Sequence, residues 1–219
     1  MTVKSTIKRR EMMKLSAATA LGVVFASGLP LSAAWAEKID GLFDNIPLAD
    51  RIMGDPNAPV TIVEYASMTC PHCKTFHEKV LPTLKEKYIE TGKAKLILRP
   101  FPFDKDARGE AAFMLALCAP QDQYYGMIDA IYGIQEQLRT SPNVIQDLRR
   151  ITKLAGMSEE QFNDCLSGKS QETYTQMIEG RNRASRDFKV TGTPSIYVNG
   201  EKLGDYSLDA VTAAIEAAL

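Results

Sequence analysis

The stretch of sequence that decides the fold is Val60-Thr61-Ile62-Val63-Glu64-Tyr65-Ala66-Ser67-Met68-Thr69-Cys70-Pro71-His72-Cys73. Its first half, from Val60 to Ala66, is rich in β-branched residues, which predicts a buried strand. From Pro71 onward the hydrophobic period changes, and an amphipathic helix kinked at Pro82 is predicted by apolar residues every four positions: Phe76, Val80, Leu84 and Tyr88. Two cysteines three residues apart therefore lie where a strand is followed by a helix.

The elements around this stretch predict a β-α-β unit, a helical insertion and a β-β-α ending. Gly92 ends the first helix, and the strand expected over residues 94–98 should pair in parallel with residues 60–66. Helices are then predicted over residues 108–119, 124–139, 141–155 (with Ser141-Pro142 as its start), a segment capped by Ser158 and Gln161, and 172–188. The chain ends with a strand at 195–198, a hairpin turn at Asn199-Gly200, a short strand near 202–203 and a helix at 208–218. The fold class is therefore α/β.

The N-terminus is predicted to be a cleaved export signal over residues 1–36. The first fourteen residues carry a net charge of +4, and an apolar stretch from Leu15 to Leu31 precedes Ala34-Trp35-Ala36, the small-x-small pattern of a cleavage site near Ala36. Lys8-Arg9-Arg10-Glu11-Met12-Met13-Lys14 resembles a twin-arginine signal, although Lys8 stands where Ser or Thr is usual. An uncleaved membrane anchor is the alternative. We expect the mature protein in the periplasm.

Composition narrows the class of protein. The chain has 219 residues, 45% of them hydrophobic and 24% charged, which fits a soluble globular protein. The part after the predicted signal is mildly acidic and has no basic stripe, so nucleic acid is excluded as a partner. No residue pattern calls for a cofactor.

The Cys70-Pro71-His72-Cys73 motif has the chemistry of thiol–disulfide exchange. That reaction needs a thiolate that attacks and a second thiol that resolves the mixed disulfide. Cys70 at the helix start lies near unpaired N–H groups that favour negative charge, whereas Cys73 lies one turn further in. We predict that Cys70 is the nucleophile and Cys73 the resolving thiol, and that the His72 ring stabilises the thiolate. Each pKa unit lost by Cys70 favours the reduced form by about 1.4 kcal/mol, or roughly 30 mV.

Two other interpretations of the same residues remain open. Cys70 and Cys73 could form a structural bridge, although so short a loop gains little chain entropy. Cys70, Cys73 and His77 also have the spacing of metal ligands, but no fourth ligand is obvious, so no metal is expected. His77 is instead predicted to be an exposed helix residue.

The order of elements, the Cys70–Cys73 motif at a strand-to-helix junction and Gly192-Thr193-Pro194 before the returning strand resemble the DsbA family of exported disulfide oxidoreductases, in its four-cysteine form. The resemblance covers the whole mature chain. It implies a thioredoxin-like fold with a helical insertion domain: residues 37–105 and 190–219 would form the thioredoxin-like domain, and residues 106–189 the insertion.

The resemblance also implies a function. A DsbA-like oxidase donates its disulfide to newly exported, unfolded proteins with free thiols, and a membrane-bound, quinone-linked, DsbB-like partner reoxidises it. A protein disulfide isomerase or reductase is the alternative, but residues 37–59 are too few for the dimerisation domain that such enzymes usually carry. A monomer is expected. A peptide-binding module without catalysis would not need an intact dithiol.

Glu64 is predicted to be a buried acid beneath the dithiol. On a pleated strand it shares a face with Val60, Ile62 and Ala66, where an unpaired carboxylate is costly. DsbA-like proteins carry a buried acid six residues before the first cysteine, and the resemblance therefore makes Glu64 a proton acceptor and donor for Cys73. The alternative is an edge strand with Glu64 facing solvent.

The resemblance further assigns Pro71, Thr193 and Pro194 to the substrate-binding surface. Sequence alone favours a trans peptide bond before Pro194, whereas the resemblance implies a cis bond lying against the dithiol.

Cys118 and Cys165 both fall in the helical insertion. In an exported chain they are expected to form a structural disulfide, with two buried free thiols as the alternative.

Overall fold

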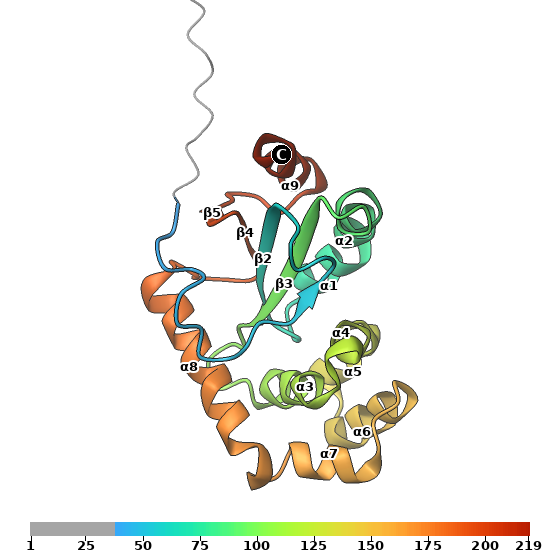
Figure 1. Ribbon diagram of the computed structural model, residues 1–219. Helices are drawn as coiled ribbons and strands as arrows, with labels where there is room; N and C mark the ends of the chain where they lie inside the picture. The colour runs from blue at the N-terminus through green and yellow to red at the C-terminus, as the bar shows by residue number, and fades with distance from the viewer. Residues whose placement is uncertain (1–37) are drawn as a thin grey trace, which may run out of the picture. The chain divides into compact units, whose positions relative to one another are not determined.

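The computed structural model describes residues 38–219 (Figure 1). The predicted export signal over residues 1–36, with its cleavage site near Ala36, lies outside the described residues. Within residues 38–219, no helix is long and apolar enough to span a membrane.

The described residues contain a five-stranded mixed sheet with the order β1-β3-β2-β4-β5. The central strand β2 (Val60–Ala66) pairs in parallel with β3 (Ala94–Pro100) and antiparallel with β4 (Ser195–Val198). The predicted strands and the hairpin from β4 to β5 (Glu201–Lys202) are confirmed. The short edge strand β1 (Ile52–Met53), antiparallel to β3, was not predicted.

The helix after β2 begins at Pro71 as predicted, but two of its segments are π-helical. It consists of α1 (Pro71–Thr75), η1 (Phe76–Val80), α2 (Leu81–Leu84) and η2 (Lys85–Ile89). Pro82 has no N–H group, and its ring would collide with the carbonyl four residues earlier in a regular α-helix. The wide π turn just before Pro82 relieves this conflict, and it replaces the simple kink that the sequence predicted.

Helices fill the whole segment between β3 and β4. They are α3 (Ala107–Cys118), η3 (Gln121–Gln123), α4 (Tyr124–Gly133), α5 (Gln135–Thr140), α6 (Val144–Leu154), α7 (Glu159–Cys165), η4 (Gly168–Ser170) and α8 (Gln171–Asp187). Figure 1 shows α3 to α7 gathered beyond one end of the sheet, with α8 running back toward it. The last helix, α9 (Leu208–Ala218), has the predicted bounds, and the Ser207 side chain caps its start.

Two helix boundaries in this segment differ from the prediction, and one is confirmed. The single helix expected over residues 124–139 is broken at Ile134, after Gly133 ends α4. Ser141-Pro142 does not start α6: the Ser141 hydroxyl accepts a hydrogen bond from the Asn143 N–H, and this local turn delays the helix to Val144. The capping box of Ser158 and Gln161 is present at the start of α7.

Three apolar clusters hold the fold together. One face of the sheet packs Val60, Ile62 and Leu96 against the helices that follow β2 and against α9. The other face packs Val63, Tyr65 and Tyr197 against the C-terminal part of α8. The third and largest cluster joins the helices of residues 107–178 to Met68, Cys70 and Cys73 at the end of β2. The dithiol therefore lies where the sheet meets the inserted helices.

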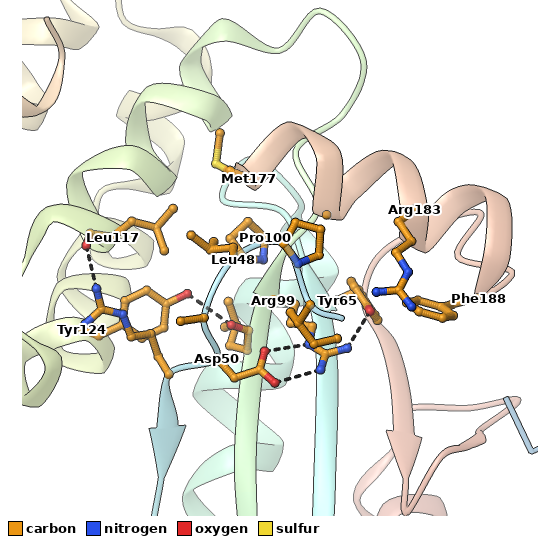
Figure 2. Close-up of a pocket in the computed structure, with 16 residues that line it drawn as sticks. Leu48, Asp50, Tyr65, Arg99, Pro100, Leu117, Tyr124, Met177, Arg183 and Phe188 are labelled. Carbon is orange, nitrogen blue, oxygen red and sulfur yellow. Dashed lines mark hydrogen bonds and ion pairs between the residues drawn. The ribbon is translucent and has the colours of Figure 1, made fainter. Parts of the chain in front are cut away.

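The segment before β1 is tied to the sheet by a buried ion pair, shown in Figure 2. The Arg99 guanidinium donates to both carboxylate oxygens of Asp50 at 2.8 Å. The third guanidinium nitrogen of Arg99, Nη1, donates to the Tyr65 hydroxyl oxygen at 2.9 Å and to the Leu42 carbonyl oxygen at 2.8 Å. All these donors have partners, as a buried guanidinium requires, so the cluster acts as an anchor for residues 38–51.

Candidate active site

Cys70 and Cys73 occupy the first turn after the central strand. Cys70 is the N-cap residue of α1 and has extended backbone angles, and Pro71 takes the first helical position, where its missing N–H costs nothing. Both cysteines are free thiols buried in the structure. The β-strand thus delivers the two sulfurs to the end of the sheet, and the helix start fixes their spacing.

The two sulfurs have opposite acidity. The pKa of Cys70 falls from the ordinary thiol value of 9.0 to about 5. The main cause is the hydrogen bond that the Cys73 thiol donates to the Cys70 sulfur, and the backbone N–H groups of Cys73 and His72 lower the pKa further. Burial of Cys70 acts in the opposite direction. The pKa of Cys73 is raised well above 9.0, chiefly by burial, then by the hydrogen bond with Cys70 and the charge of Glu64. At neutral pH the reduced site therefore holds a thiolate at Cys70 and a thiol at Cys73.

The loop before β4 faces the dithiol. Its Thr193-Pro194 peptide bond is cis, and Sγ of Cys70 lies 3.2 Å from the backbone oxygen of Thr193. The structure therefore brings Cys70 and the Thr193-Pro194 turn together, although 123 residues separate Cys70 from Thr193. Beside this turn, a cleft is lined by residues 191–196 and 202–206.

The ring of His72 is exposed and turned toward the C-terminal part of the chain. Its Nδ1 lies 3.0 Å from the hydroxyl oxygen of Tyr206. His72 acts on the Cys70 sulfur through its backbone N–H. Tyr206, which lines the same cleft as Pro194, was not predicted, because nothing in the local sequence links residue 206 to the dithiol.

Glu64 lies fully buried on β2, and its hydrogen-bond partner is His77, a residue that the sequence analysis assigned to the surface. Oε2 of Glu64 lies 3.0 Å from Nε2 of His77, whose side chain is only 2% exposed. The prediction that His77 is an exposed helix residue is wrong. The signal was present in the sequence, because Cys73, Phe76, His77 and Val80 follow the i, i+3, i+4, i+7 spacing of a buried helix face.

The buried position of His77 also bears on the metal interpretation. Its Nε2 contacts Glu64, and Nδ1 lies 3.5 Å from Oδ1 of Asp129. Among residues 38–219, no three side chains of His, Cys, Asp or Glu are arranged to hold a metal ion.

Side chains from the inserted helices hold the turn that carries Cys70. The Gln135 amide donates to the carbonyl oxygens of Met68 and Cys70, both at 2.9 Å, and the Tyr132 hydroxyl donates to the Ser67 carbonyl oxygen at 3.3 Å. Gln135 begins α5 directly after the break at Ile134. The sequence did not reveal these contacts, because they depend on where the helix breaks.

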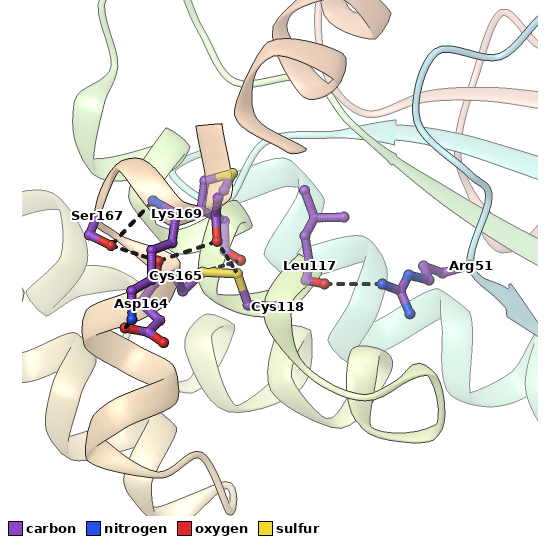
Figure 3. The surroundings of a disulfide bond; sticks show 9 residues. Arg51, Leu117, Cys118, Asp164, Cys165, Ser167 and Lys169 are labelled. Atoms are coloured by element: carbon purple, nitrogen blue, oxygen red, sulfur yellow. Dashed lines mark hydrogen bonds and ion pairs between the residues drawn. A yellow bond between two sulfur atoms is a disulfide. The ribbon is translucent and has the colours of Figure 1, made fainter. Parts of the chain in front are cut away.

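Cys118 and Cys165 are joined by a disulfide between the ends of α3 and α7. Figure 3 shows the bond beside the η4 turn, where the Ser170 hydroxyl lies 3.8 Å from Sγ of Cys118. The bond closes a loop between residues 47 positions apart, and it lies wholly within the helical segment.

Comparisons with known proteins agree with this arrangement. The family model described as thioredoxin matches residues 48–217. A putative protein-disulfide oxidoreductase of Rickettsia conorii is 33% identical over 171 residues, covering 78% of this chain and 60% of the relative. A probable disulfide bond formation protein D of Bacillus anthracis is 35% identical over 174 residues, covering 75% of this chain and 76% of the relative. The chain thus spans about 60% of the length of the Rickettsia relative.

Solved structures give the same result. The crystal structure of Wolbachia pipientis alpha-DsbA1 has a TM-score of 0.69 at 33% identity, covering 77% of this chain and 89% of that one. Oxidised BdbD from Bacillus subtilis has a TM-score of 0.68 at 19% identity, covering 77% and 92% of the two chains, and shows likeness of fold alone. The prediction of a thioredoxin-like fold with a helical insertion is confirmed.

Proposed function

Because this chain belongs to the DsbA-like branch of the thioredoxin family, we propose that it is a protein-disulfide oxidoreductase that donates its Cys70–Cys73 disulfide to other proteins. The observation that carries the proposal is the opposite acidity of two thiols one helical turn apart, with the more acidic one beside Thr193. A structural bridge has no use for such a difference, whereas an exchange enzyme depends on it.

The reaction proceeds in two exchanges. A substrate thiolate attacks Sγ of Cys70, the Cys70–Cys73 bond breaks, and Cys73 leaves as a thiolate that takes up a proton. The second thiolate of the substrate then attacks the substrate sulfur that is bonded to Cys70 in the mixed disulfide. The bond to Cys70 breaks, and Cys70 leaves as a stabilised thiolate. Two electrons pass from the substrate thiols to the enzyme disulfide, and the substrate gains a disulfide. The low pKa of Cys70 makes it the better leaving group in the second step.

The other residues of the site take supporting roles in this proposal. Glu64 accepts and donates the proton of Cys73, which its charge already influences. Pro71, Thr193 and Pro194 bind the substrate segment, with the cleft of residues 191–196 and 202–206 beside them. His72 stabilises the Cys70 thiolate through its backbone N–H, while its ring contacts Tyr206. Cys118–Cys165 is a structural cross-link.

The direction of exchange follows from the thiolate. Stabilising the reduced form at Cys70 makes the disulfide a stronger oxidant, by roughly 30 mV for each pKa unit. We therefore favour an oxidase over an isomerase or reductase. Its proposed clients are unfolded exported proteins with free thiols, and a DsbB-like, quinone-linked membrane protein would restore its disulfide. The basic and apolar N-terminus supports export to the periplasm.

The proposed division of the chain follows the order of strands and helices, with the inserted helices between β3 and β4. Residues 37–105 and 190–219 would form the thioredoxin-like domain and residues 106–189 the helical insertion, with a monomer as the working unit. The cluster around Cys70 and Cys73 draws on both parts, which makes the insertion a wall of the site.

Redox equilibration of Cys70–Cys73 with glutathione tests the proposal. The oxidised protein should convert a reduced, unfolded model protein into its disulfide form in stoichiometric amounts, and its potential should lie nearer that of DsbA than that of thioredoxin, whose values are about −120 and −270 mV. A potential near the thioredoxin value would favour the reductase alternative. Failure to exchange with glutathione at all would refute the function.

A further inference from the structure

Reduction of the Cys70–Cys73 disulfide requires the buried sulfur of Cys73 to take up a proton. Two substrate thiols release two protons and two electrons, and the enzyme ends as a Cys70 thiolate and a Cys73 thiol. One proton must therefore reach Cys73, which is 0% exposed, while the other goes to solvent. Reoxidation requires the reverse, because Cys73 must lose that proton before it can attack.

Glu64 alone cannot connect Cys73 with solvent. Its side chain is completely buried on β2, so each proton that it passes on must come from another group. Within residues 38–219, Oε2 of Glu64 contacts His77 and Oε1 has no hydrogen-bond partner. One oxygen is thus held, and the other is free to give and take a proton.

His77 continues the path from Glu64 toward the surface. Its Nε2 faces Glu64 at 3.0 Å, and its Nδ1 faces Oδ1 of Asp129 at 3.5 Å. Asp129 belongs to α4, and its side chain is 67% exposed. The three side chains form a row from the core to water. Nε2 is within hydrogen-bond distance of Glu64, whereas Nδ1 lies at ion-pair distance from Asp129 and has no hydrogen-bond partner among residues 38–219.

The groups packed around His77 come from three elements. Glu64 lies on β2, Asp129 and Tyr132 on α4, and Cys73 one turn earlier on the helix of His77 itself. The ring centroids of His77 and Tyr132 are 4.9 Å apart, and burial raises the pKa of Tyr132 well above its ordinary value. Tyr132 therefore stays neutral, and the titration of His77 is governed by the two carboxylates.

We propose that His77 relays protons between Glu64 and the solvent, and that Asp129 is the positioning residue at its exposed side. When the disulfide is reduced, a proton passes from Nε2 of His77 to Glu64 and from Glu64 to the Cys73 thiolate. The ring is left neutral, with its remaining proton on Nδ1 toward Asp129. It becomes charged again when the ring turns so that the vacant nitrogen reaches the side of Asp129 and takes up a proton from water, which returns a nitrogen bearing a proton to Glu64. On reoxidation the proton moves from Cys73 through Glu64 to His77 and out. The relay rests on the exchange reaction proposed above.

The charge state of His77 suits this role. Burial alone would lower the pKa of His77, but the carboxylates of Glu64 and Asp129 outweigh it and raise the pKa to about 9. The ring is therefore charged at neutral pH and ready to donate. Its neutral form, which accepts the proton of Cys73 during reoxidation, becomes more abundant as the pH approaches 9, and the rate of that step should rise accordingly.

The test follows the step in which Cys73 displaces glutathione from Cys70. Reduced protein is mixed with oxidised glutathione, samples are quenched with acid, and the mixed disulfide is counted by mass spectrometry from pH 6 to 10. In the unaltered protein the decay rate of the mixed disulfide should rise with pH and level off above about pH 9, where His77 loses its proton. This rising part of the pH–rate profile is called the limb below. His77→Gln should remove the limb and slow decay at pH 7 about tenfold, a modest share of what a proton-transfer group contributes.

Asp129→Asn supplies the more specific result. Removing a carboxylate that raises the pKa of His77 should move the limb to lower pH. The melting temperature of the variant should stay that of the unaltered protein, which separates this shift from general damage to the fold. Asp122→Asn, an exposed carboxylate just before α4, is the matched control and should leave the limb in place.

Each outcome decides between proposals. A limb unchanged in Asp129→Asn, or moved equally in Asp122→Asn, would overturn the relay, as would an unchanged rate and profile in His77→Gln. If His77→Gln fails to fold, the two aspartate variants still decide. Absence of any exchange in the unaltered protein would instead count against the oxidoreductase function itself.

Discussion

The two cysteine pairs of this molecule lie in the same apolar cluster but at opposite ends of helices. Cys70 caps the N-terminus of α1 and Cys73 follows in its first turn, whereas Cys118 and Cys165 are the last residues of α3 and α7. All four contact the cluster that joins the sheet to the inserted helices. Burial among apolar side chains therefore does not distinguish the pairs.

The helix ends do distinguish them. The N-terminus of a helix offers unpaired N–H groups and a positive dipole end that stabilise a thiolate, and backbone N–H groups lower the pKa of Cys70. The C-terminus offers carbonyl oxygens and a negative dipole end, which oppose a thiolate at Cys118 or Cys165. Since the thiolate is the reactive form, the first pair is suited to exchange and the second to remaining bonded.

Substitution of Cys70 or Cys73 should give the largest effect. Cys70→Ser should abolish exchange, because the thiolate that attacks and leaves is lost. Cys73→Ala should accumulate mixed disulfides through Cys70, because nothing resolves them. Both are measured by turnover of a reduced model protein and by gel analysis of trapped complexes. Alkylation of Cys73 before Cys70 in the reduced protein would reverse the assignment.

Removal of the second pair should affect stability and leave activity. The Cys118–Cys165 loop of 47 residues corresponds to about 4 kcal/mol on the chain-entropy model, which is an upper figure. The Cys118→Ala, Cys165→Ala double variant should therefore melt up to about 8–16 °C earlier yet retain exchange at moderate temperature.

Stepwise reduction checks the same contrast within one sample. Mild reductant should open Cys70–Cys73 first, because its reduced form is the stabilised one. Peptide mapping of the exported protein should find Cys118 joined to Cys165. Joining of Cys118 to Cys70 or Cys73 would contradict the separation of the two pairs.

The sequence predicted well those features that depend on neighbouring residues. β2, β3, the capping box at Ser158 and the hairpin at Asn199-Gly200 follow from local composition and turn residues. The edge strand β1 was missed because a strand of two residues is too short to show an alternation of apolar and polar side chains. Only its pairing with β3 identifies it as a strand.

The site was predictable in its reactive groups and not in its surroundings. The motif fixed the positions of Cys70 and Cys73, and alternation along β2 placed Glu64 on the same apolar face as Val60 and Ile62, where it is buried. His77 was assigned to the surface because only every fourth residue of its helix was taken as the buried face. Gln135 and Tyr206 reach the site from distant segments, and no local pattern reports such contacts.

A smaller effect is expected from Glu64→Gln. The amide keeps the shape of the carboxylate but cannot carry the proton of Cys73, so steps that protonate or deprotonate Cys73 should slow by about tenfold to a hundredfold, with little change in melting. The pH–rate profile of reoxidation measures this, and Glu86→Gln, at an exposed position on η2, is the control. An unchanged profile would remove Glu64 from the proton path.

The smallest effect is a pH-dependent difference in stability between the reduced and oxidised forms. In the reduced protein the pKa of Cys70 is about 5 when folded and takes the ordinary thiol value of 9.0 when unfolded. Between these values the unfolded state binds more protons than the folded state, so the stability of the reduced form rises with pH and is lost as the pH falls through 5. The oxidised form has no such thiol.

Melting curves of both forms at pH 6 and 7 test this difference while Cys118–Cys165 stays closed. Water around the Cys70 sulfur screens part of the effect, so the reduced form should gain less than about 1.4 kcal/mol per pH unit over the oxidised form, or roughly 3–5 °C at most. Cys73 acts only above pH 9, with the opposite sign, because its raised pKa keeps the folded thiol protonated there. In Cys70→Ser the pH-dependent gain should vanish. A gain that persisted in that variant would assign the titration to another group, and the contrast between the two cysteine pairs would then no longer rest on the thiolate at the start of α1.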